Sequence, residues 1–304
     1  MRRKLQLKTL LPGTTSIFEQ VLPGTSGQRS GLIFTVFDPN KKQVTEFDIV
    51  HERSFHLFII SQDLKVYQHI HPLQQPDGSL VVDTVLPQPG NYHIICDFSP
   101  TAGFPQVLRR HLRTSGVQLP LQPVQARIIP DRVLTKSVNG TRFELILDPA
   151  VAVAGALRGL TAGTDESTGK PVEDLQPYLG AWGHTVIMSE DATDYLHSHP
   201  TVNVRKREDG QRIRSPVEVS FNTFFSRAGR YRIWSQFQRR DTLATVSFDV
   251  EVAQLQSLAR WEGNGWRVFG TGHSELGPIR ALALSGVCMP EVTLSRSARQ
   301  PPIE

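Results

Sequence analysis

The sequence predicts an all-β fold with two tandem antiparallel β-sandwich domains, and three observations support it. The chain of 304 residues is long enough for two domains that each bury a core. Short segments rich in β-branched and aromatic residues recur along it, separated by Gly, Pro, Asn and Asp. One histidine-rich motif also occurs twice. Regular short strands with turn signals are typical of antiparallel sandwiches rather than of βαβ units.

The strand signals are, in chain order, GLIFTVFD, HLFIIS, SLVVDTVL, NYHIICDF, TRFELILD, HTVIMS, PVEVSF, RYRIWSQF and LATVSFDVEV. Side chains alternate along a strand, so NYHIICDF and RYRIWSQF each present one apolar face. We expect these faces to form the cores, with Cys96 as a small buried hydrophobic residue. The residues of the two faces are Tyr92, Ile94, Cys96 and Phe98 in one strand and Tyr231, Ile233, Ser235 and Phe237 in the other.

An internal duplication sets the domain organisation. The segment HLFIISQDLKVYQHIHP (56–72) aligns without a gap with HTVIMSEDATDYLHSHP (184–200), at a constant offset of 128 residues. Farther along, GNYHIICDF aligns with GRYRIWSQF at an offset of 139, which places insertions in loops of the second copy. We therefore predict an N-terminal arm, a first sandwich, a proline-punctuated linker, a second sandwich and a C-terminal tail, over residues 1–30, 31–120, 121–136, 137–252 and 253–304.

Each copy of the motif carries three histidines at the same separations: His56, His69 and His71, and His184, His197 and His199. In the first copy, SQDL is predicted to form a four-residue turn, so that position 60 pairs with 65 and position 56 with 69. Histidines two residues apart on a strand emerge from the same face. Each motif is therefore predicted to gather its three imidazoles around one point.

Three converging imidazoles suit a borderline divalent ion such as Cu(II) or Zn(II), and the motifs offer no carboxylate-rich shell for Mg²⁺ or Ca²⁺. We therefore predict the six histidines as ligands of Cu(II) or Zn(II). His51 and His93 are additional donors in the first copy, where the second has Leu179 and Arg232, so the two sites are not expected to be equivalent. The same histidines can instead be structural, bonding neighbouring carbonyls and closing strands without any cofactor.

Other chemistry finds little support in the sequence. The formal net charge of +4 is small and spread along the chain, so no nucleic-acid partner is predicted. No apolar run has the length of a transmembrane segment. No Walker, dinucleotide or nucleophile-elbow pattern occurs, and the sequence predicts no enzyme. The basic start MRRKLQLKTLLPGTTSIF is interrupted by Gln6, Lys8 and Pro12, and no export signal is recognisable in it.

The stretches HERSFHLFIISQDLKVYQHIHP and GKPVEDLQPYLGAWGHTVIMSEDATDYLHSHP resemble bacterial secreted or periplasmic proteins with tandem YtkA-like domains. The resemblance rests on H-l-x-v-S-x-D, followed by H-x-H-P and by a later G-x-Y-x-i strand. It implies small immunoglobulin-like β-sandwiches, a location outside the cytoplasm and a non-enzymatic role. Such proteins are sometimes associated with copper or other heavy-metal handling.

The sequence thus predicts a non-enzymatic binding protein that captures or delivers Cu(II) or Zn(II). The resemblance places it in the periplasm or outside the cell, with a cytoplasmic location as the alternative. Its partner would be the metal ion or another extracytoplasmic protein. One alternative function is a metal-free structural or protein-interaction module, in which the histidines tie hairpins together. The other is a metal-dependent enzyme with an open coordination position.

Overall fold

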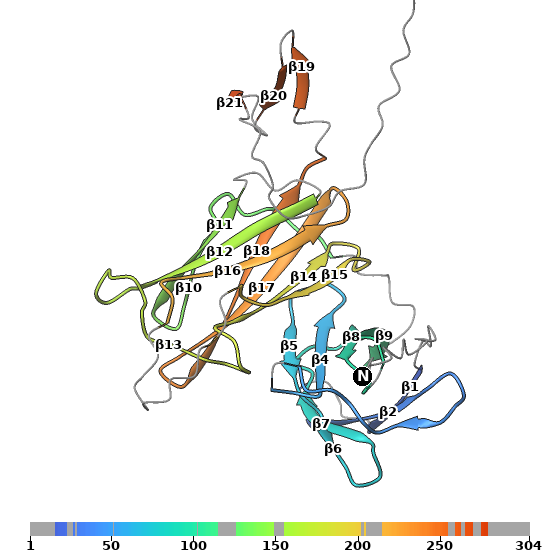
Figure 1. Cartoon of the computed structure of the whole chain (residues 1–304). Helices are drawn as coiled ribbons and strands as arrows, with labels where there is room; N and C mark the ends of the chain where they lie inside the picture. Colours follow the sequence, from blue (N-terminus) through green and yellow to red (C-terminus); the bar gives the residue numbers. More distant parts are fainter. Residues whose placement is uncertain are drawn as a thin grey trace, which may run out of the picture. The chain divides into compact units, whose positions relative to one another are not determined.

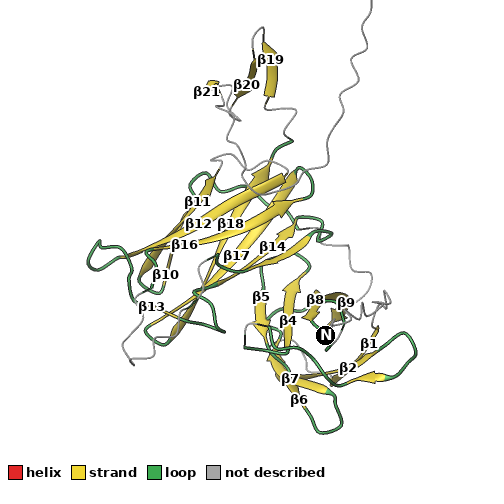
Figure 2. Ribbon diagram, in the orientation of Figure 1, coloured by secondary structure: helices red, strands yellow, loops and turns green. Residues whose placement is uncertain are grey.

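The structure is a computed structural model, and the residues it describes are strands and the loops between them. They are 16–22, 27, 29–50, 52–101, 103–114, 126–148, 155–201, 204, 215–254, 259–262, 265–269 and 275–278. All regular secondary structure in these ranges is β-strand (Figure 2). The described residues form no helix of the length and hydropathy needed to cross a bilayer. The all-β prediction is confirmed.

The first sandwich consists of two antiparallel sheets (Figure 1). One has the order β1-β2-β7-β6, with β3 beside β2, and is built from β1 (Ser16–Leu22), β2 (Arg29–Phe37), β3 (Gln43–Val44), β6 (Leu73–Gln74) and β7 (Leu80–Val85). The other has the order β5-β4-β8-β9, from β4 (Phe55–Ser61), β5 (Tyr67–Ile70), β8 (Asn91–Phe98) and β9 (Gln106–Arg113). The predicted face of β8 is confirmed, since Tyr92, Ile94, Cys96 and Phe98 lie in the core.

The second sandwich repeats this plan. One sheet has the order β10-β11-β12-β16, from β10 (Thr135–Val138), β11 (Thr141–Asp148), β12 (Gly155–Asp165) and β16 (Glu218–Phe225). The other has the order β13-β17-β14-β15, with β18 beside β17, from β13 (Leu175–Gln176), β14 (His184–Ser189), β15 (Tyr195–Ser198), β17 (Gly229–Arg239) and β18 (Thr242–Val252). On β17, Tyr231, Ile233 and Phe237 join the core, and Ser235 is fully buried, as predicted.

Residues 1–254 form one compact unit and residues 255–304 a second one. The second unit contains a three-stranded sheet of β19 (Ala259–Glu262), β20 (Gly265–Phe269) and β21 (Glu275–Pro278). In the first unit, β1 lies within the predicted arm but pairs along its whole length with β2. The five predicted domain ranges stay predictions.

A third apolar cluster joins the two sandwiches. Phe58 and Ile60 of β4 pack there with Val186 and Met188 of β14 and with Trp234 of β17. Strands β4 and β14 are buried at every residue. A strand that is apolar on both faces is covered on both sides. One face of each strand lines its own core, and the other faces the partner sandwich.

The predicted register of the first hairpin is wrong by two residues. Strand β4 pairs with β5 so that Phe58 lies opposite His69 and Ile60 opposite Tyr67. The connecting loop is longer than the predicted SQDL turn, because the Ser61 N–H donates to the Val66 carbonyl at 3.0 Å and Leu64 adopts a left-handed φ of 60°. Continued by two residues, this register places position 56 opposite 71 rather than 69.

Candidate functional site

Each motif brings its three histidines together. His56 lies in β4 and His69 in β5, and His71 follows β5. The equivalent places in β14 and β15 belong to the second set, His184, His197 and His199. In each set one ring nitrogen per histidine lies within 4.8 Å of the others. We call the two sets the first and second triads. In the described part of the chain, no other group of three or more His, Cys, Asp or Glu side chains converges in this way.

The spacing within the first triad matches that of metal ligands. His56 Nδ1 lies 3.1 Å from His69 Nε2 and 3.3 Å from His71 Nε2, and the latter two nitrogens are 3.2 Å apart. Four donors at about 2.0–2.1 Å from a tetrahedral Zn²⁺ lie about 3.3–3.4 Å from one another. The three nitrogens are therefore spaced nearly as three corners of such a tetrahedron.

Hydrogen bonds on the far sides of the rings fix two tautomers. His56 Nε2 lies 3.0 Å from the Val50 carbonyl oxygen, and His69 Nδ1 lies 3.0 Å from Gln236 Oε1. The amide of Gln236 is oriented by its Nε2, which donates to Thr245 Oγ1. Carbonyl oxygens only accept hydrogen bonds. In their neutral forms, His56 therefore carries its proton on Nε2 and His69 carries its proton on Nδ1. The two nitrogens that face each other at 3.1 Å then both carry lone pairs, which either a hydrogen bond from the adjacent His71 Nε2 or a cation can stabilise.

A proton is poorly suited to be that cation. Burial, followed by the neighbouring His56 and Arg53, lowers the pKa of His71 to about 3. Burial is also the main reason that the pKa of His69 lies far below its usual value. Burial disfavours the charged imidazole, and each additional proton would repel the next. His69 and His71 are therefore neutral donors at physiological pH.

The second triad uses the equivalent residues, with its three ring nitrogens within 4.8 Å of one another. His184 Nε2 lies 2.9 Å from the Tyr178 carbonyl oxygen, as His56 does from that of Val50. His197 Nδ1 lies 3.0 Å from Asp97 Oδ2. The Nε2 atom of His197 is buried and, among the described residues, has no hydrogen-bond partner. Because Nδ1 is bonded to Asp97, Nε2 is the His197 nitrogen that would be left to bind a metal ion.

Both triads border open hollows in the surface. A cavity of about 520 Å³ reaches His69 and His71, and a second one of about 330 Å³ reaches His197. A ligand set that is otherwise buried needs such an entry path.

Of the two further donors predicted for the first copy, His93 lies apart from the triad. His93 pairs across β8 and β9 with His111, their ring centroids 5.1 Å apart. Burial, followed by His111 and Arg109, lowers the pKa of His93 to about 4. His51 lies outside the described residues.

The sequence reasoning missed Asp97 and Gln236. Both are polar residues at equivalent positions of the repeated late strand, 139 residues apart in CDF and SQF. Each lies in the cross-strand position next to the first histidine of its own copy, as His56 pairs with Asp97 and His184 with Gln236. A polar residue repeated on the outward face of an apolar strand was the available signal.

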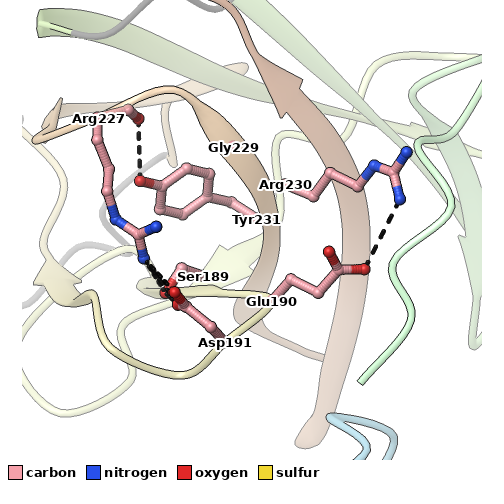
Figure 3. Close-up of a pocket in the computed structure, with 7 residues that line it drawn as sticks. All are labelled: Ser189, Glu190, Asp191, Arg227, Gly229, Arg230 and Tyr231. Atoms are coloured by element: carbon pink, nitrogen blue, oxygen red, sulfur yellow. Dashed lines mark hydrogen bonds and ion pairs between the residues drawn. The ribbon is translucent and has the colours of Figure 1, made fainter. Parts of the chain in front are cut away.

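A separate hollow of about 120 Å³ lies at the end of the second sandwich, beside Ser189 and Tyr231 (Figure 3). The Tyr231 hydroxyl lies 3.0 Å from the Arg227 carbonyl oxygen, as the Tyr92 hydroxyl does from that of Gln88 at 2.6 Å. Such an inward hydrogen bond is the tyrosine corner of immunoglobulin-like sandwiches. Across the hollow, Arg227 pairs with Asp191 at 2.7 Å. This hollow is thus framed by structural contacts of the repeat.

Residues 16–111 and 136–254 match the model of a family described as a domain of unknown function, DUF8832. The chain belongs to this family. The two matched segments contain both triads and both outer partners, Asp97 and Gln236. A YtkA-like relationship stays a hypothesis from the sequence motifs. No curated protein matches the chain.

Several solved structures have a similar arrangement of strands. The Escherichia coli adhesin FdeC is 13% identical over 79% of this chain and 64% of its own, with a TM-score of 0.23. The Yersinia pseudotuberculosis adhesin InvE is 8% identical over 83% and 67%, with a TM-score of 0.22. A two-domain fibronectin type-III segment of chicken tenascin is 9% identical over 77% and 97%, with a TM-score of 0.20. The chain spans less than two thirds of the FdeC structure, and likenesses this low carry no functional argument.

Proposed function

We propose that this DUF8832 protein binds Cu(II) or Zn(II) through its two triads and acts by capture or delivery, without turnover. The observation that supports this best is the convergence of lone pairs in the first triad. His56 Nδ1 and His69 Nε2 face each other at 3.1 Å, while their protons are committed to Val50 and Gln236. A metal ion at this point would bind both lone pairs, together with that of His71 Nε2, which lies 3.3 Å and 3.2 Å from these two nitrogens.

The donor chemistry selects the class of metal. Each triad offers three imidazoles and no carboxylate among its inner ligands. Imidazole donors suit Cu(II) and Zn(II), whereas Mg²⁺ and Ca²⁺ prefer oxygen. Since three protein ligands leave a fourth position open, an ion can enter or leave through the adjoining cavity. The resemblance of the histidine motifs to YtkA-like proteins supports a location in the periplasm or outside the cell.

Calorimetric titration of the full metal-free chain with Cu(II) and with Zn(II) at pH 7.5 tests this function. We expect micromolar or tighter binding of two equivalents. His71→Ala should remove one equivalent and His199→Ala the other, since each deletes a partly exposed ligand of one triad. His93→Ala/His111→Ala is the matched control, because it removes two histidines outside the triads. Circular dichroism and thermal melting establish that each variant is folded.

A metal-free interaction module is the second candidate function. Its support is that His69 and His197 each hydrogen-bond across to the other sandwich, which a purely structural pin would also do. Strand β9 ends its sheet in the described part of the chain and exposes Val107, and such an edge can pair with another protein. No saturable metal binding, or binding unchanged in both triad variants, would contradict the metal function and favour this one.

A further inference from the structure

The two triads lie against each other. The ring centroids of His69 and His184 are 5.6 Å apart, and those of His56 and His197 are 5.5 Å apart. His69 and His197 also meet, at 5.8 Å. Each of these contacts joins a ring of one triad to a ring of the other. Six imidazoles from two copies of one motif therefore form a single cluster, at the interface where β4 and β14 are buried on both faces.

Each sandwich also orients a ligand of the other. Gln236 of the second sandwich accepts the proton of His69, and Asp97 of the first accepts that of His197. These two bonds are equivalent under the repeat, because Asp97 and Gln236 occupy matching positions beside His56 and His184. Outer hydrogen bonds of this kind fix the tautomer and the direction of a metal-ligating histidine. Neither triad is therefore fully oriented by its own sandwich.

We propose that the two triads form one dinuclear metal centre, which holds two divalent transition-metal ions side by side across the interface between the sandwiches. This rests on the proposed function and adds that the two ions interact. His56, His69 and His71 hold one ion, and His184, His197 and His199 hold the other. Gln236 and Asp97 are positioning residues, each acting through a histidine of the opposite sandwich.

The two ions bind in a defined order. The Asp97 carboxylate accepts a hydrogen bond from His197, whereas the neutral amide of Gln236 accepts one from His69. A carboxylate makes its histidine a stronger donor, so the second triad fills first. Two divalent ions this close repel each other, which weakens the second binding step further. The two equivalents therefore bind in separate steps rather than as identical sites.

Electron paramagnetic resonance of the full chain loaded with Cu(II) tests the dinuclear centre. At one equivalent we expect the spectrum of an isolated ion. At two equivalents we expect either a half-field transition, which requires two ions a few ångströms apart, or a loss of signal through spin pairing. His71→Ala and His199→Ala should each bind one ion and show neither effect. His93→Ala/His111→Ala should behave as the unaltered chain.

Each outcome separates the two proposals. If two equivalents bind but the spectrum at saturation is the sum of two isolated ions, the dinuclear centre is wrong and the metal-binding function stands. If no copper binds in the calorimeter, the function itself is wrong. Spin interaction that survives in His71→Ala would also overturn the assignment, because that variant lacks a complete first triad.

Discussion

The two triads use equivalent histidines and differ in their outer partners. In both, the Nε2–H of the first histidine donates a hydrogen bond to the carbonyl oxygen six residues earlier, that of Val50 or Tyr178. In both, the middle histidine reaches across to the other sandwich, but it meets an amide in one case and a carboxylate in the other. Duplication has thus kept the histidines while their outer hydrogen-bond partners diverged, and under the proposed function these partners would set the difference in affinity between the two sites.

A second contrast lies on the same two strands. His93 of β8 faces His111 across the strand pair, whereas the equivalent Arg232 of β17 faces Asp249, with its Nε 2.6 Å from Asp249 Oδ1. Arg232 also donates to the Leu64 carbonyl of the first sandwich at 2.7 Å. One copy therefore places a pair of imidazole rings where the other has an ion pair. We therefore expect a drop in pH to lower stability more through the histidine pair than through the ion pair.

The largest expected effect is a loss of stability on truncating equivalent residues of the apolar interface, where the two copies differ. Phe58 and Val186 are equivalent and fully buried, but Phe58 stacks on His69 with centroids 4.3 Å apart. Phe58→Ala should lower the free energy of unfolding by about 3–5 kcal/mol, and Val186→Ala by roughly 2 kcal/mol. Guanidinium denaturation measures both. Phe224→Ala, at a 59% exposed phenylalanine, is the control and should cost less than about 0.5 kcal/mol. Equal losses at the two buried positions would contradict the unequal packing.

The outer partners are tested one site at a time. In a His71→Ala background, which leaves only the second triad, Asp97→Asn should weaken Cu(II) binding by about 10–100-fold, because the carboxylate no longer supports His197. In a His199→Ala background, Gln236→Glu should strengthen the first triad. Calorimetry gives both constants. An unchanged affinity in Asp97→Asn would show that the carboxylate does not set the difference between the sites.

The His93 contrast predicts a dependence of stability on pH. The pKa of His93 is about 4 in the folded chain and about 6.5 when unfolded. Between these values the unfolded state binds the proton and the folded state does not, so stability falls as pH drops from 6.5 towards 4. With allowance for partial exposure, the loss from His93 at pH 5 is on the order of 1 kcal/mol. Urea denaturation at pH 7.5 and 5 should show that His93→Gln reduces this loss, and an equal loss in the variant would refute it.

The smallest effect concerns the two tyrosine corners. Arg227 pairs with Asp191 in the second copy, where the first copy has Gln88. Both partners are about half exposed, so the pair is screened by solvent. Arg227→Gln should therefore cost about 0.5 kcal/mol, measured by thermal melting. Tyr231→Phe, which removes the corner hydrogen bond, should cost more; the reverse ranking would mean that the ion pair holds this loop.

The fold and the triads could be predicted because both follow local rules. Alternation along NYHIICDF identified the core face, and the repeated spacing identified which histidines converge. The register was predicted wrongly because the turn was judged from residue types. Leu64 and Ala192 adopt φ values of 60° and 56°, a conformation that their side chains do not favour and that no composition rule would suggest.

The interface between the sandwiches could not be predicted in the same way. Phe58, Ile60 and His56 share a strand face, but whether that face meets solvent or a second domain depends on contacts 128 residues away. Asp97 and Gln236 were visible as polar residues in apolar strands, yet their targets belong to the opposite copy. Long-range pairing between copies follows from tertiary packing, which leaves no fixed spacing in the sequence.

The alternation of β8 also has a consequence for electron transfer. Asp97 faces the second triad, whereas its neighbour Cys96 is fully buried in the core of the first sandwich, on the opposite face. Thiolate sulfur favours Cu(I), while imidazole nitrogens suit the cupric ion. With Cys96 turned away by a single residue, a copper ion bound in the triads would have only imidazole ligands, which would favour its cupric form, and no thiolate from this strand. An ion captured as Cu(II) would then be released as Cu(II), and its transfer would need no redox partner.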